Sequence, residues 1–310
     1  MAPRPGWDKS FEWDGYVPFE EMPFLYNPPE GYISTANNKT IGNDFPYYIS
    51  GLWADPSRSS RIKEVLEEDK KFSLEDMKSL QLDLTSNYSK EILPAILKNA
   101  GTYENPIFNR AIQFLNDWNH VESIDSEGTL IFHSISNEII RNIYYDELSL
   151  LGDKYFETYI GLKYITKRNL RRILKSHTNK WVDDIRTPNK NETIDEIITK
   201  SIESGIQKVV DIYGPNWSNW KWGSAHSLTH KHILGDIKIL NYLFNLNIGP
   251  FLSGGSDVTP NAGGYSLHKG FNQTSGASMR RIVDFSDLNM TNMILPTGQS
   301  GLHNSPHYSD

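Results

Sequence analysis

The most informative stretch of the sequence is Asn27-Pro-Pro-Glu-Gly-Tyr-Ile-Ser-Thr-Ala-Asn-Asn38. Two prolines and a glycine open it, Tyr32-Ile33-Ser34 alternates like a short strand, and Asn37-Asn38 breaks that strand. An asparagine side chain can direct its amide N–H at an oxyanion that develops during a reaction. The stretch therefore predicts either a donor for oxyanion chemistry or an ordinary Asn-Asn turn.

Arg58 follows about twenty residues later, in Trp53-Ala-Asp-Pro-Ser-Arg58. We expect the first helix to begin at about Arg61, because Ile62, Val65 and Leu66 fall on one helical face. Arg58 would stand at the entrance to that helix. From there its guanidinium could donate two hydrogen bonds to a carboxylate or orient the asparagine.

A long helical block comes next. Ser73-Leu-Glu-Asp76 has the pattern of a capped helix start. Hydrophobic periodicity predicts further helices over 89–99, 106–118, 134–150, 153–175 and 192–212. The basic run Lys167–Arg172 lies on helical spacing beside apolar residues. We interpret this run as a solvated helix face rather than a nucleic-acid contact.

The two ends of the chain differ from this block. The first thirty residues combine many aromatic residues with five prolines, which favours a meandering loop packed against something larger. From about residue 250 glycine and serine become frequent. Two strands are predicted there, Met279–Phe285 and Met290–Leu295. The layout indicates an α+β fold in which both ends return to the same sheet.

Composition excludes several classes of protein. No apolar run in the 310 residues reaches the roughly 18–20 residues of a membrane span. The formal net charge of −7 argues against nucleic-acid binding. The absence of cysteine rules out disulfides, thiolate zinc sites and a cysteine nucleophile. Met1-Ala-Pro-Arg-Pro5 has no apolar run of the kind found in signal peptides.

Three other groups of residues could carry chemistry. The histidines His226, His230 and His232 could bind a metal ion, but they lack a carboxylate partner at a metal-site spacing. We expect them to belong to a packed aromatic turn. Ser300 lacks the Gly-x-Ser-x-Gly spacing of a nucleophile elbow and predicts a turn. Gly254–Asp257 predicts a flexible loop and no phosphate site.

Taken together, these blocks resemble the penicillin acylase (penicillin amidase) family over essentially the whole chain. The motifs that carry the resemblance stand in the family's order. They are Pro5-Gly-Trp-Asp, Glu12-Trp-Asp-Gly-Tyr-Val-Pro-Phe-Glu-Glu-Met-Pro23, Asn27 to Asn38, Asp44-Phe-Pro-Tyr-Tyr48 to Trp53 and Arg58, Trp222-Gly to His232, and Gly276-Ala-Ser-Met-Arg280 to Tyr308.

The resemblance implies an N-terminal-nucleophile hydrolase with a layered αββα core, of which this chain would form part. Residues 1–60 would belong to that core, 61–245 would be a large inserted helical region, and 246–310 would return to the core sheet. In the family, an N-terminal serine attacks an amide carbonyl with its own amino group as base. The oxyanion asparagine corresponds to Asn37, with Asn38 as the less favoured alternative, and the supporting arginine to Arg58.

The nucleophile has no counterpart in this sequence. The resemblance therefore makes the chain the later part of a β chain, with an α chain and the start of the β chain as partners. The substrate would be a small acylated amide, such as a β-lactam side chain or an acyl-homoserine lactone. The chemistry needs no cofactor. The resemblance implies a structural calcium that could bind in the full-length enzyme, but its ligands are not matched here, because Tyr47, Tyr48 and Ile49 stand where the family has an aspartate. Family precursors are usually exported.

A non-catalytic remnant or scaffold of the same fold is the alternative function.

Overall fold

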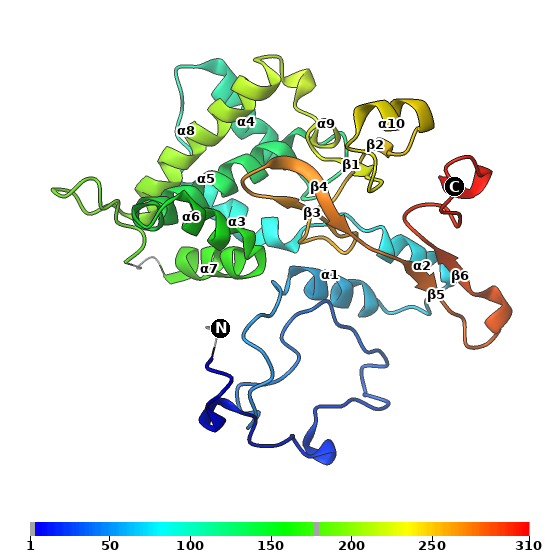
Figure 1. Ribbon diagram of the computed structural model, residues 1–310. Helices are drawn as coiled ribbons and strands as arrows, with labels where there is room; N and C mark the ends of the chain where they lie inside the picture. The colour runs from blue at the N-terminus through cyan, green and yellow to red at the C-terminus, as the bar shows by residue number, and fades with distance from the viewer. Residues whose placement is uncertain (1–3, 177–179, 310) are drawn as a thin grey trace.

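The computed structural model describes residues 4–176 and 180–309, so expectations that involve Met1–Pro3 and Asp310 lie outside the described residues. The α+β class is confirmed. The described residues form the following helices (Figure 1): α1 Ser57–Leu66, α2 Leu74–Gln81, α3 Asn87–Lys98, α4 Pro106–Asp117, α5 Glu127–Leu150, α6 Asp153–Gly161, α7 Lys163–Ser176, α8 Ile194–Tyr213, α9 Trp222–Ala225 and α10 Lys238–Phe244. No helix in this part of the chain is both long and apolar enough to cross a bilayer.

Side-chain capping fixes the starts of α2, α3, α4, α5 and α8. The predicted capping box at Ser73 is confirmed, since its hydroxyl accepts from the Asp76 N–H and the Asp76 carboxylate accepts from the Ser73 N–H (2.8 Å). α5 starts seven residues earlier than its apolar pattern predicts, because Ser126 caps it. The single helix predicted over 153–175 is two helices, α6 and α7, which meet at Leu162.

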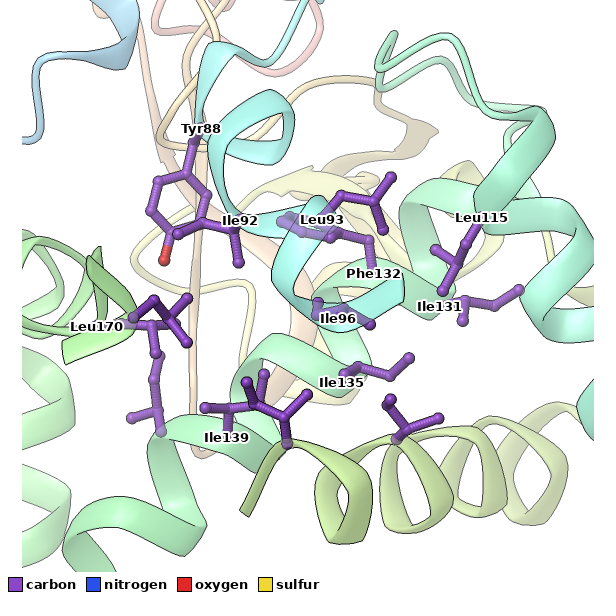
Figure 2. Packing of buried hydrophobic residues seen from close by; sticks show 14 of the residues in the cluster. Tyr88, Ile92, Leu93, Ile96, Leu115, Ile131, Phe132, Ile135, Ile139 and Leu170 are labelled. Carbon is purple, nitrogen blue, oxygen red and sulfur yellow. The ribbon is translucent and has the colours of Figure 1, made fainter. Parts of the chain in front are cut away.

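The core is built around α5. Ile131, Phe132, Ile135 and Ile139 are buried along this helix, and side chains of α3, α4 and α7 pack against them (Figure 2). α8 crosses the same helix at Gly205, where the Ser134 hydroxyl donates to the Gly205 carbonyl at 2.8 Å. Most of the apolar burial that stabilises the fold therefore lies within the helical block.

A small mixed sheet lies beside the helices. Its strand order is β2 (Ile248–Leu252), β1 (Ser227–His230), β4 (Gly270–Gly276) and β3 (Gly263–Ser266). β1 pairs antiparallel with β2 and parallel with β4, and β3 pairs antiparallel with β4. The two strands predicted near the end of the sequence are confirmed, with shorter bounds, as β5 (Arg280–Ile282) and β6 (Asn292–Ile294).

The strand predicted at Tyr32–Ser34 is wrong, and so is the expectation that both ends share one sheet. Within the described residues 4–56 there is no strand, because no neighbouring strand pairs with this segment's backbone groups. β5 and β6 form a two-stranded sheet of their own. The N-terminal segment instead runs as an open loop away from the helices (Figure 1), and Trp13 and Tyr16 are 85% and 92% exposed.

Candidate active site

Asn37 lies in a turn whose backbone is fixed by the chain around it. Its φ of 62° is left-handed, a conformation that asparagine adopts more readily than most residues. The Asn37 carbonyl accepts from the Ala54 N–H at 2.8 Å. Ala36 and Ala54 are both buried, so the turn packs next to the start of α1. The Asn37 side chain is exposed.

Arg58 orients the Asn37 side chain. Its guanidinium, in the first turn of α1, donates to Asn37 Oδ1 at 2.9 Å and to the Ala36 carbonyl at 2.8 Å. Arginine has only donors, so the oxygen of the Asn37 amide must face it. The Asn37 Nδ2 donors have no hydrogen-bond partner within the described residues and point away from the guanidinium.

Asn38 has a different part in the turn. Its Oδ1 accepts from the Ala36 N–H at 3.0 Å, and its Nδ2 donates to the Lys39 carbonyl at 3.1 Å. This is the local side chain to backbone bonding that asparagine uses in turns. Of the two asparagines, Asn37 is therefore the one with free amide donors.

The basic residues of α7 hold the start of α1 in place. Arg171 donates to Asp55 Oδ1 and to Ser57 Oγ, both at 2.9 Å, and Asp55 Oδ1 in turn accepts from the Ser57 N–H at 2.9 Å. Arg168 reaches the carbonyls of Gly51 and Trp53, both at 3.4 Å. The interpretation of this run as a solvated helix face is therefore wrong for these residues.

Lys167, in the same run, is fully internal. It forms an ion pair with Asp257, and the two side chains are only 4% and 7% exposed. Burial alone would raise the pKa of Asp257, but the charges of Lys167 and Lys163 outweigh it and lower that pKa. Sequence reasoning missed this pair because its members are 90 residues apart.

The loop that carries Asp257 is also not the flexible loop that its glycines predict. Residues 255–259 are buried. The Gly255 N–H donates to the Glu122 carbonyl at 2.7 Å, and Thr259 Oγ1 accepts from the Ser256 N–H at 3.0 Å. The φ of 74° at Gly255 is left-handed, which explains the glycine there by backbone geometry.

A cleft of about 560 Å³ opens beside Asn37. Asn37 and Arg58 line one part of it, and Lys163, Asp257 and Arg280 line others. A pocket of this size holds a small organic molecule. The cleft thus combines free amide donors with a surface rich in cationic side chains.

The expectation of a packed aromatic turn is confirmed for His226, whereas His230 is the last residue of β1 and His232 follows it in a loop. The buried His226 ring stacks on Trp222, with ring centroids 4.7 Å apart, and Trp222 stacks on His133 at the same distance. Burial lowers the pKa of His226 to about 4. His232 Nδ1 accepts from the Leu234 N–H at 3.1 Å. Residues 4–176 and 180–309 contain no group of three or more His, Cys, Asp or Glu side chains that could hold a metal ion.

Two further positions lie away from the cleft. Ser300 stands in a turn, with its N–H bonded to the His307 carbonyl (2.9 Å) and its Oγ accepting from the Leu302 N–H (3.1 Å). Tyr47, one of the residues that replaces the implied calcium ligand, donates to Glu21 Oε2 at 2.6 Å. Glu21 raises the pKa of the Tyr47 hydroxyl through this hydrogen bond.

Comparison with known proteins gives a consistent picture. The family model described as penicillin amidase matches residues 1–310. The chain is 25% identical to the acyl-homoserine lactone acylase QuiP of Pseudomonas fluorescens (strain Pf0-1) and 24% identical to the penicillin acylase 2 proenzyme of Pseudomonas sp. (strain SE83). Each match covers 99% of this chain and 38% of the relative. A shorter match, 38% identical over 68 residues, joins 21% of the chain to 8% of the penicillin G acylase of Escherichia coli.

Proposed function

The chain belongs to the penicillin amidase family, and from this membership we propose that it forms part of an amide-hydrolysing acylase and supplies the asparagine of its oxyanion hole. The observation that carries the proposal is the Asn37–Arg58 pair. Arg58 holds the oxygen of the Asn37 amide, so the Nδ2 donors are free beside the cleft.

The proposed chemistry is acyl transfer. A serine at the N-terminus of the β chain, outside this sequence, attacks the amide carbonyl with its own amino group as general base. The carbonyl oxygen becomes an oxyanion, and Asn37 Nδ2 donates a hydrogen bond to it. One such donor is worth about 2.7–4 kcal/mol to the transition state. Arg58 is a positioning residue, because it acts through Asn37.

The chain spans about two fifths of the length of the curated relatives it matches. We propose that the α chain and the beginning of the β chain complete the layered αββα core and cover the N-terminal segment. Support comes from residues 4–52, where Trp7, Trp13, Tyr16 and Phe24 are more than four-fifths exposed. Apolar side chains gathered at this density on one segment are typical of a contact surface.

The proposed substrates are small acylated amides of the β-lactam or acyl-homoserine lactone type, which the names of the relatives specify for those proteins. We test the proposal with a chromogenic phenylacetyl anilide. The chain is assayed alone and after co-production with the polypeptide that supplies the α chain and the β-chain start. Activity in co-production alone supports the proposal. Activity of this chain alone would overturn the proposed nucleophile. Inactivity in both formats would favour the non-catalytic scaffold.

A further inference from the structure

We propose that the cleft beside Asn37 is a subsite for a carboxylate group of the substrate, with Lys163 and Arg280 as its specificity-determining residues. This inference rests on the proposed function for the identity of the substrate, but not for the binding of an anion. Such a subsite would favour a substrate that carries a carboxylate over a neutral acylated lactone.

The first support is the charge balance of the cleft. Its lining includes the cationic side chains of Arg58, Lys163, Arg280 and Arg281, against one carboxylate, that of Asp257. The Asp257 carboxylate is already neutralised by Lys167, its buried ion-pair partner. In a chain with a net charge of −7, this cleft is therefore a local concentration of positive charge.

The second support is that Arg58, Lys163 and Arg280 form no ion pair within the described residues, although Lys163 lies close enough to Asp257 for its charge to act on that carboxylate. Within the described residues, Arg58 donates to an amide oxygen and a carbonyl, and Lys163 Nζ lies 3.3 Å from Ser275 Oγ. Arg280 Nη2 donates to Asn261 Oδ1 at 2.5 Å. The hydrogen-bond partners of all three cations are neutral groups. Asp257, which Lys167 and Lys163 share, is the one carboxylate that lines the cleft.

The third support is the placement of Lys163 by the sheet. Gly264 of β3 has no room for a Cβ, because Lys163 Nζ and Ser275 Oγ lie in the space that a methyl group would occupy. Gly264 has an ordinary backbone conformation, so its glycine is explained by this close approach and not by a left-handed φ. The close approach of β3 thus positions the ammonium group of Lys163 at the wall of the cleft.

These features fit a carboxylate better than a neutral group. Arginine and lysine donors bind carboxylates through charge-assisted hydrogen bonds, which are stronger than hydrogen bonds between neutral groups. A neutral lactone in the same place would leave the cations without a counter-charge. The carboxylate can belong to either half of the substrate, the acyl group or the amine, since the cleft borders the Asn37 amide on which both halves converge.

The test uses the chain co-produced with the α chain and the β-chain start, and three anilides. One is phenylacetyl anilide, one has a carboxylate on the aniline ring, and one has an acyl group that ends in a carboxylate. We expect one carboxylated anilide to have a KM about tenfold below that of its carboxamide analogue. Lys163→Met should raise that KM about tenfold and leave KM for phenylacetyl anilide unchanged.

Matched variants separate charge from folding. Lys154→Met removes an exposed lysine of α6 that does not line the cleft, and it should change neither KM. Lys163→Arg should retain most of the preference, because it keeps the charge. Gly264→Ala should mimic Lys163→Met by displacing the ammonium group. Equal effects of Lys163→Met on charged and neutral substrates would overturn the proposal.

A binding measurement that needs no catalysis tests the carboxylate subsite separately from the proposed acylase activity. We would measure binding of 4-aminobenzoate, 4-aminobenzamide, glutarate and glutaramide by ligand-observed NMR. At least one carboxylate should bind more tightly than its amide, with a preference that weakens in high salt and in Lys163→Met. Failure of anilide hydrolysis with this preference intact would refute the acylase function alone. Equal binding of acid and amide in both pairs would refute the subsite.

Discussion

Replacing Lys167 by methionine should destabilise the protein strongly, because it strands the Asp257 carboxylate in the interior. The side chains of this pair are 4% and 7% exposed, and Asp257 Oδ2 has no hydrogen-bond partner in the described part of the chain. Methionine fills nearly the same volume as lysine, so the change removes the charge and leaves little cavity.

The size of the effect follows from burial. Removing one partner of a buried ion pair typically costs about 3–5 kcal/mol, because an uncompensated charge remains in a medium of low dielectric constant. Lys175→Met is the matched control on the same helix. Lys175 is 71% exposed and pairs with Glu91 at the surface, so its loss should cost less than about 1 kcal/mol.

The cost of Lys167→Met should also depend on pH. In the wild-type protein Asp257 has a lowered pKa, so its contribution to stability is present above the unfolded pKa and is lost as the pH falls through the folded one. In the variant, burial without Lys167 raises the pKa, and protonation at low pH relieves the stranded charge. The difference in free energy of unfolding between wild type and variant should therefore be smaller at pH 5 than at pH 8.

Urea unfolding followed by circular dichroism at both pH values measures these differences. The double variant Lys167→Met with Asp257→Asn should recover part of the loss, because it removes the charge that the single variant strands. A cost below about 1 kcal/mol at pH 8, or one equal to that of Lys175→Met, would refute the buried ion pair.

Three other variants test the fold and the site. Gly205→Ala should cost about 1–3 kcal/mol in urea unfolding, because its Cβ would lie 2.8 Å from Ile135 Cα. The free energy of unfolding of the wild type should fall by about 3 kcal/mol as the pH drops from 6.5 towards 4, because the pKa of His226 is lower in the folded than in the unfolded protein. His226→Gln should flatten this dependence on pH. Arg58→Lys should lower kcat of the assembled acylase about ten- to a hundredfold with little change in unfolding, because one ammonium group cannot replace the fork that orients Asn37.

The helices were the most predictable part of the fold. Apolar residues at helical spacing and capping residues such as Ser73 are local signals, and the structure follows them closely. The break at Leu162 and the early start of α5 escaped prediction. At Leu162 the apolar pattern continues although the helix is interrupted. At α5 the backbone hydrogen bonds of the helix begin before the apolar pattern does.

Contacts between distant segments were not predictable in the same way. The sequence did not indicate β1 to β4, whose strands are short and whose pairing joins residues far apart in the chain. The run from Lys167 to Arg171 has the composition of a solvated face. Its acidic and carbonyl partners, on the segment around Asp55 and in the loop at Asp257, became apparent only in the folded structure.

The predictable residues of the site are those that belong to motifs of the family resemblance. Asn37 and Arg58 were predicted as a pair, and the structure places them in contact. The assignment of the catalytic role to Asn37 stays a prediction. The surrounding cations were not identified, because Lys163 and Arg280 come from elements more than a hundred residues apart, and the motif that contains Arg280 did not indicate a role for its side chain.

The most direct test of the central proposal is the kcat of Asn37→Ala in the assembled acylase. We predict a fall of about 10²–10³-fold in kcat with KM nearly unchanged, because the lost hydrogen bond forms only in the transition state. Asn38→Asp is the matched control, since it keeps the oxygen that accepts from the Ala36 N–H. A kcat of Asn37→Ala close to that of the wild type, or a loss confined to Asn38→Asp, would contradict the role of Asn37 as the oxyanion donor.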